Sequence, residues 1–196
     1  MPTYRRLPVR DLALVASFAA LMAVLGLPGG LTLFGNAVPI TLQSLGVMLA
    51  GAILGWKRGA LAMVVFLALV AAGLPLLSNG RGGLGVFAGA SAGYLLAWPL
   101  GAAVVGWLVE RRLPAYPAWW GLFANVVGGI GVVYLFGVPV MAAVLGLSLA
   151  VAAGKAAVFL PGDITKAIIA VVVTAGVHRG YPAVLPARER SRSHVG

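Results

Sequence analysis

Two charged side chains stand at the start of the last long apolar stretch of the sequence. In FLPGDITKA, residues 159–167, Asp163 precedes Lys166 by three positions. On a helix this spacing places both on one face, where a carboxylate and an ammonium can bind a polar ligand or pair with each other. The alternative is structural, since Asp163 is a good N-cap for a helix that Pro161 and Gly162 separate from the preceding segment. Because ionisable groups within apolar segments are costly and usually functional, we favour a binding site.

No catalytic set accompanies this pair. The chain has no cysteine, and its two histidines, His178 and His194, follow the last apolar stretch. The glycines of SNGRGGLGVFAG (78–89) have the Gly-x-Gly-x-x-Gly spacing of dinucleotide-binding loops, but no βαβ unit surrounds them. Gly154-Lys155 lacks the remainder of an ATP-binding P-loop. We therefore expect no enzyme, no ATPase motif of its own, no metal and no cofactor.

The elements that position these residues are predicted to be membrane-spanning helices. Of the 196 residues, 61% are hydrophobic and 9% are charged, with a mean hydropathy of +1.03, whereas soluble domains carry about 25% charged residues. The net charge of +10 comes from short basic clusters between apolar stretches. Such clusters are typical of topology signals and phospholipid contacts, not of nucleic-acid binding. We expect one all-α integral membrane domain, 1–196, in the plasma membrane, with basic cytoplasmic segments at 1–11 and 180–196.

Seven apolar stretches have about the length needed to cross a bilayer. They are 12–28, 40–56, 59–77, 93–109, 118–136, 139–160 and 164–177. If every basic cluster is cytoplasmic, the number of crossings must be even. We expect 139–160, which contains Lys155 and ends in Leu-Pro-Gly, to stay on the outer side or to dip in and return. This predicts a bundle of six transmembrane helices with both termini cytoplasmic, and seven crossings is the alternative.

This topology turns three long connections outward, at 29–39, 78–92 and 137–162. They contain or adjoin the polar residues that topology does not require, namely Asn36, Gln43, Asn79, Arg81, Ser91, Lys155, Asp163 and Lys166. A small-molecule site under outward-facing loops is therefore expected. The Gly-rich loop around Arg81 caps a ligand in this interpretation, and a merely flexible loop is the alternative.

Small residues form a stripe on the first predicted helix. Ala16 and Ala20 are four positions apart, as are Ala19 and Ala23. Such a smooth face can pack inside the fold or against a partner subunit, and composition does not decide between the two.

Three segments resemble one family of transport proteins. AVPITLQSLGVMLAGAILGWKRGAL (37–61), GLPLLSNGRGGLGVFAGASAGYLLAWPL (73–100) and FLPGDITKA (159–167) resemble BioY, the biotin-specific substrate-binding subunit of energy-coupling-factor transporters. Motif order and chain length match over nearly the whole sequence. Where the family usually reads GPTGGY, this chain has GASAGY at 89–94, which keeps a hydroxyl at Ser91 and loses the proline. The resemblance implies a six-helix bundle that binds biotin from outside and joins a transmembrane coupling protein and two ATPases.

The resemblance also implies which residues contact biotin. Asp163 accepts the ureido N–H groups, and Asn79 or Gln43 donates to the ureido carbonyl. Arg81 is the first choice for the valerate carboxylate, and Lys166 either shares that role or orients Asp163. Tyr94 is expected to cover the apolar bicycle in preference to Trp98, which lies one turn deeper. The expected biotin-binding residues are Gln43, Asn79, Arg81, Ser91, Tyr94, Asp163 and Lys166.

The same resemblance assigns the stripe on the first helix, Ala16, Ala19, Ala20 and Ala23, to the coupling protein. Two transport alternatives remain: a subunit for another small vitamin, and a biotin transporter that works alone. A membrane enzyme would need a nucleophile or metal set. A scaffold protein would not need charged residues such as Asp163, Lys166 and Arg81 on its outer side.

Overall fold

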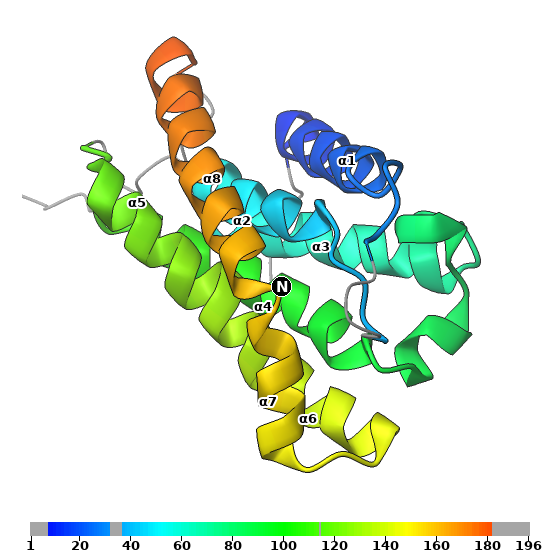
Figure 1. The fold of residues 1–196 in the computed structure, drawn as a ribbon. Coiled ribbons are helices and arrows are strands. Elements are labelled where there is room, and N and C mark those ends of the chain that lie inside the picture. The colour runs from blue at the N-terminus through cyan, green and yellow to red at the C-terminus, as the bar shows by residue number, and fades with distance from the viewer. Residues whose placement is uncertain (1–7, 32–36, 114, 182–196) are drawn as a thin grey trace, which may run out of the picture.

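The computed structural model describes residues 8–31, 37–113 and 115–181, and the regular elements of these residues are helices. The α-helices are α1 Val9–Val24, α2 Gln43–Leu54, α3 Trp56–Ala71, α4 Ala92–Glu110, α5 Ala118–Ala124, α6 Val133–Leu145, α7 Leu149–Ala157 and α8 Leu160–Gly180. Two 3₁₀ turns, η1 Ser78–Gly80 and η2 Leu84–Ala88, lie between α3 and α4, and the π-helix η3 Asn125–Val132 joins α5 to α6. The predicted all-α class is confirmed (Figure 1).

Among the described residues, three continuous helices are long and apolar enough to cross a membrane. They are α4, the 28-residue helix Ala118–Leu145 formed by α5, η3 and α6, and α8. The shorter α2 is also apolar. The chain is therefore a helical membrane protein, while the count of six crossings stays a prediction.

The stretch 139–160 does not form a helix of its own. Its first residues continue the helix that begins at Ala118, and that helix ends at Gly146 with a left-handed φ of 65°. The expected break at 137–138 was wrong because helices in lipid tolerate Pro139, and Gly137 allows the Tyr94 ring to pack closely. The remaining α7, capped by Ser148, has nine residues. At about 14 Å, it is too short to span a bilayer core of about 30 Å.

The last helix begins earlier than the sequence predicted. It starts at Leu160, so Pro161 and Gly162 lie inside its first turn. The Asp163 N–H donates to the Phe159 carbonyl at 2.9 Å, which makes Asp163 a helical residue and not the N-cap. Proline is favoured at the first position of a helix, where its missing N–H costs nothing.

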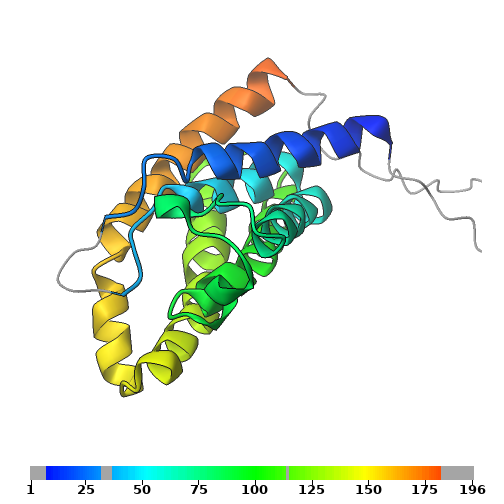
Figure 2. The same cartoon turned by 90° about the vertical axis from the view of Figure 1, so that its right-hand side faces the viewer.

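Helix α4 lies at the centre of the bundle and packs on α2, α3, α6 and η3. Close approach depends on glycines, since a side chain on Gly101 would meet the Gly128 carbonyl and one on Gly51 would meet the Ala102 carbonyl. Helix α8 runs beside α2, and α1 lies along the edge of the bundle (Figures 1 and 2). The buried ends of α2, α4, α6 and α8 are thereby brought together.

Helix α1 does not expose the whole small-residue stripe. Ala16 and Ala20 are exposed and Ala23 is half-buried, whereas Ala19 is buried with Val15 in the core. The coupling-protein contact of Ala19 stays a prediction, and its burial argues against it. A four-residue spacing does not say which of two overlapping stripes faces the neighbouring helices.

Candidate functional site

A cavity lies where the ends of α2, α4 and α8 meet the middle of the long helix Ala118–Leu145. The loop at 37–41 and the segment at 77–81 complete its wall. About 70 Å³ inside it is open to water, enough for a few molecules. Apolar side chains such as Leu95, Val133 and Phe159 line much of it. The polar lining residues are Thr41, Gln43, Ser44, Ser78, Arg81, Ser91, Tyr94, Tyr134, Asp163 and Lys166.

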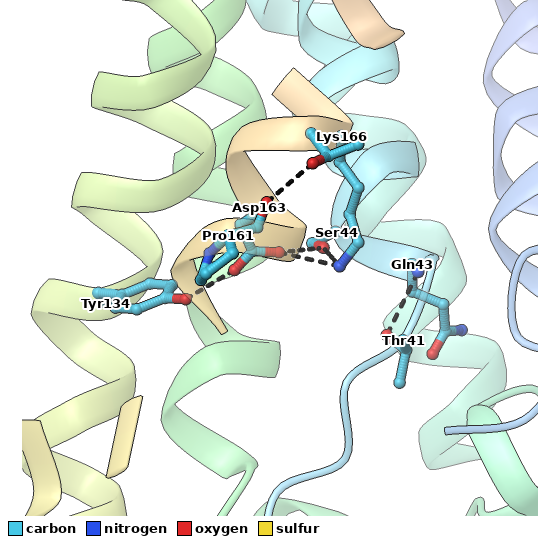
Figure 3. Close-up of polar contacts among 8 residues, drawn as sticks. Thr41, Gln43, Ser44, Tyr134, Pro161, Asp163 and Lys166 are labelled. Carbon is cyan, nitrogen blue, oxygen red and sulfur yellow. Dashed lines mark hydrogen bonds and ion pairs between the residues drawn. The ribbon is translucent and has the colours of Figure 1, made fainter. Parts of the chain in front are cut away.

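The Asp163–Lys166 pair is at the wall of this cavity. Lys166 Nζ lies 2.9 Å from Asp163 Oδ1, and the two residues are only 6% and 7% exposed. One helical turn separates them on α8, so both side chains point to α2 (Figure 3). There Ser44 Oγ donates to Asp163 Oδ1 at 3.0 Å and accepts from Lys166 Nζ at 3.0 Å. The predicted proximity of the two charges is confirmed, and Ser44 joins them to α2.

Tyr134 completes the network from the opposite side. Its hydroxyl donates to Asp163 Oδ2 at 2.6 Å, so each carboxylate oxygen has a donor (Figure 3). The Tyr134 ring also meets Tyr94 edge to face, with centroids 5.9 Å apart. A buried carboxylate with an ammonium and two hydroxyl partners is a rigid, pre-positioned acceptor. Removing one member of such a buried pair typically costs about 3–5 kcal/mol.

Sequence reasoning missed Ser44 and Tyr134. The available signal for Tyr134 was a lone hydroxyl in the middle of a 28-residue apolar helix, where a polar side chain needs a partner. Ser44 adjoins Gln43 in the segment 37–61 that resembles the family, but only Gln43 was expected at the site. Neither signal identifies Asp163 as the partner, because both residues are more than 25 positions away from it.

Gln43 is at the cavity wall but its donors are already used. Its Nε2 donates to the carbonyls of Met22 and Leu76, each at 3.1 Å, and the residue is 1% exposed. That Gln43 donates to a ligand carbonyl stays a prediction, and these two hydrogen bonds argue against it. The side chain instead ties α1 to the segment before η1.

Asn79 does not reach the cavity. Its side-chain oxygen accepts the Gly30 N–H at 3.1 Å, and it lines a different groove on the outside, beside Ala23 and Leu76. With φ of 62°, Asn79 has the left-handed conformation that turns its side chain away from that of its neighbour. The neighbour, Ser78, lines the cavity instead. The ligand contact expected of Asn79 is therefore assigned to the preceding residue, Ser78.

Two hydroxyl groups at the cavity are buried and have no partner among the described residues. They belong to Ser78 and Tyr94. A buried hydroxyl normally has a hydrogen-bond partner, so both are available to a ligand. Tyr94 was predicted at the site and is confirmed to line it, whereas Ser78 was missed. Trp98, expected to lie too deep, also lines the cavity one turn below Tyr94.

Arg81 stands at the entrance. It lines both the cavity and an outer hollow formed by the Gly-rich loop, and Ser91 borders the same two spaces. Its Nε donates to the Ser78 carbonyl at 3.4 Å, and no carboxylate pairs with it in the part of the chain that the structure describes. A half-buried guanidinium in this place can receive an anionic group. Across residues 8–31, 37–113 and 115–181, no group of His, Cys, Asp and Glu is arranged to hold a metal.

These helices and this cavity define a class: an all-helical membrane protein with a largely apolar small-molecule cavity that ends in a buried ion pair. A model described as the BioY family matches residues 1–183. The chain therefore belongs to the BioY family, as the three sequence segments predicted.

The sequences of two relatives align with nearly the full chain. The biotin transporter BioY of Rhizobium etli is 47% identical, with 91% of this chain and 98% of the relative covered. The biotin transporter BioY of Rhodobacter capsulatus is 44% identical with the same coverage. Among solved structures, the S-component for biotin from an ECF-type ABC transporter matches with a TM-score of 0.84 and 31% identity, over 87% of this chain and 92% of that chain.

Proposed function

We propose that this chain takes up biotin as the substrate-binding subunit of an energy-coupling-factor transporter. The observation that carries the proposal is the buried network of Asp163, Lys166, Ser44 and Tyr134 at the cavity of a chain in the BioY family. The relatives named as biotin transporters support the substrate. The similarity to a biotin S-component supports the class of transporter.

Biotin fits the chemistry of the cavity. Its ureido ring has two N–H donors and a carbonyl. Asp163 Oδ2, which accepts only the Tyr134 hydroxyl, has a lone pair left for one ureido N–H, and the carbonyl receives the free hydroxyl of Ser78 or Tyr94. The valerate carboxylate reaches Arg81 at the entrance, where the guanidinium binds it through a bidentate pair of hydrogen bonds. Tyr94 and Trp98 cover the apolar bicycle. Lys166 orients Asp163, because its ammonium already contacts that carboxylate and Ser44.

The cavity must widen to accept a whole biotin. The space now open holds only a few waters. Arg81 and Ser91 border both the cavity and the outer hollow, so movement of these two side chains joins the spaces. Ligand entry is then from the side of the Gly-rich loop.

In the membrane, six helices cross, with both termini in the cytoplasm of a plasma-membrane protein. The basic clusters at 57–58 and 111–112 then lie inside, and the cavity opens outside. The short α7 stays near the outer surface. Ala16 and Ala20, with half-buried Ala23, present the smooth face of α1 to the transmembrane coupling protein, and two ATPases supply energy.

Titration of the purified protein with biotin and with biotin methyl ester tests the assignment. Asp163→Asn is expected to weaken binding of both compounds by about 100-fold, since it removes the charged acceptor. Arg81→Ala is expected to weaken biotin about 10- to 100-fold and to leave the ester unchanged, because the ester has no carboxylate to pair. Unchanged biotin affinity in both variants contradicts the site. A wild-type protein that prefers a different vitamin contradicts the substrate.

Dependence on an energising module is tested separately. In cells that lack the coupling protein and the ATPases, this chain is expected to bind labelled biotin but not to accumulate it. Accumulation there would favour the alternative, a transporter that works alone.

A further inference from the structure

A shallow apolar groove lies at the opposite end of α4 from the cavity. Trp56 of α3 and Trp107 of α4 form its sides, and Ala103 and Val104 form its floor. The two indoles are 42% and 46% exposed. Along α4, Trp107 is 13 positions beyond Tyr94, which is about 20 Å of helix. The groove is thus separate from the ligand cavity and close to the other membrane interface.

The groove is held in shape by backbone contacts. Gly106 faces the backbone of Gly55 and Trp56, and a side chain there would collide with it. The Trp56 N–H donates to Glu110 Oε1 at 2.9 Å, which joins the start of α3 to the end of α4. The distance between the two indoles is therefore set by packing of the helix backbones.

Two cations stand at the rim, each beside one of the indoles. The Arg111 guanidinium carbon lies 3.5 Å from the centre of the Trp107 ring, and Lys57 Nζ lies 5.3 Å from the centre of the Trp56 ring. Two acidic groups lie nearby, and the charge of one of them, Glu110, interacts with those of Arg58 and Lys57. Asp11 pairs with Arg58 at 3.2 Å, and Glu110 binds the Trp56 N–H.

We propose that this groove binds one anionic phospholipid of the cytoplasmic leaflet, with phosphatidylglycerol as its simplest form. An acyl chain lies on Ala103 and Val104 between the indoles, and the phosphate meets Arg111 and Lys57. The charge complementarity is direct, because guanidinium and ammonium groups are phosphate ligands and basic pockets between helices at the inner surface bind anionic headgroups. Tryptophans at the headgroup level fit the same depth.

The inference needs the membrane orientation proposed above but not the identity of the transported ligand. A phospholipid fits better than a protein segment because the four lining residues are apolar and the two cations lie beside the two indoles. The face of α1 assigned to the coupling protein contributes no residue to the groove.

Native mass spectrometry of the purified full chain tests the proposal, with phosphatidylglycerol and phosphatidylcholine as probes at equal concentration. Wild type is expected to retain one phosphatidylglycerol in preference to phosphatidylcholine. Lys57→Gln and Arg111→Gln are each expected to lower that bound fraction about fivefold. Arg112→Gln is the matched control, because Arg112 contacts the rings of Trp119 and Trp120, which do not line the groove.

Four outcomes would overturn the inference. One is equal retention of the two lipids by wild type. Another is unchanged retention in the Lys57→Gln/Arg111→Gln double variant, with folding verified by biotin affinity equal to that of wild type. The third is a loss in Arg112→Gln as large as in Arg111→Gln, which would reveal an unspecific basic surface. Displacement of the lipid whenever the coupling protein is added would assign the groove to that protein instead.

Discussion

Apart from the hydroxyls of Ser78 and Tyr94 that face the cavity, the cavity half of the bundle and the opposite half differ in how their buried polar groups are hydrogen-bonded. Near the cavity, Asp163, Lys166, Tyr134 and Gln43 have hydrogen-bond partners. Toward the other end, both side-chain amide atoms of Asn125 are buried and have no hydrogen-bond partner in the described part of the chain. A paired group is fixed in place, whereas an unpaired one costs stability without holding anything.

This difference separates a built site from a packing compromise. Around Asp163 the partners come from α2, α6 and α8, so three elements are fixed relative to one carboxylate. Asn125, in contrast, is fully buried with both amide atoms unpartnered among the described residues. Substitutions in the cavity half are therefore expected to harm binding or stability, and those in the other half to be tolerated or beneficial.

The largest effect is expected at Lys166. Lys166→Met leaves Asp163 buried with its countercharge removed, so the free energy of unfolding should fall by about 3–5 kcal/mol. Biotin affinity should fall with it. Thermal unfolding in detergent and biotin titration measure the two effects, with the exposed Lys57→Met as control.

A double variant distinguishes charge from packing at this position. In Asp163→Asn/Lys166→Met the stranded charge is absent, so much of the stability should return while biotin binding stays lost. If the double variant is as unstable as Lys166→Met, the ion pair is not the cause and the comparison between the two halves fails.

Next in size is Tyr134. Tyr134→Phe removes the donor to Asp163 Oδ2 and keeps the ring that meets Tyr94. Loss of a hydrogen bond to a charged group should lower stability by about 1.5–3 kcal/mol. Biotin affinity should drop about 10-fold as the carboxylate loses its fixed orientation. Tyr181→Phe, at an exposed position past the end of α8, should change neither quantity.

The charged core of the site was predictable from sequence, and its partners were not. Asp163, Lys166 and Arg81 stand out because a charge in an apolar chain needs a reason. The identity of the partner depends on which helices are neighbours, and Ser44 lies 119 positions from Asp163. Composition also does not predict the left-handed conformation of Asn79 or the position of Ser78 at the cavity.

The helices were likewise predictable from sequence, whereas the positions of their ends were not. Apolar stretches located the helices, since hydropathy reports burial in lipid. Local chemistry then shifted the boundaries, because Pro161 lies in the first turn of α8, where the sequence predicted the end of a segment, and Pro139 lies inside a helix that continues past it. Proline is a weaker signal for the end of a helix in lipid, because neighbouring helices satisfy the freed backbone groups.

Gln43 separates a structural tie from a ligand contact. Gln43→Met keeps the length of the side chain and removes both donors, so stability should fall by about 1–2 kcal/mol. Biotin affinity should change less than about threefold, because the amide hydrogens point to Met22 and Leu76. A loss of affinity as large as that of Asp163→Asn, with stability intact, would restore Gln43 as a direct contact.

The smallest effect is expected at Asn125 and has the opposite sign. Leucine has nearly the same branched shape, so Asn125→Leu replaces two unpartnered polar atoms with apolar ones and should raise stability by up to about 1 kcal/mol. Thermal unfolding of Asn125→Leu, measured together with Gln43→Met, compares two amide residues that are 0% and 1% exposed. Destabilisation of both variants would mean that bound water hydrogen-bonds to Asn125. The buried amides of both halves of the bundle would then have hydrogen-bond partners.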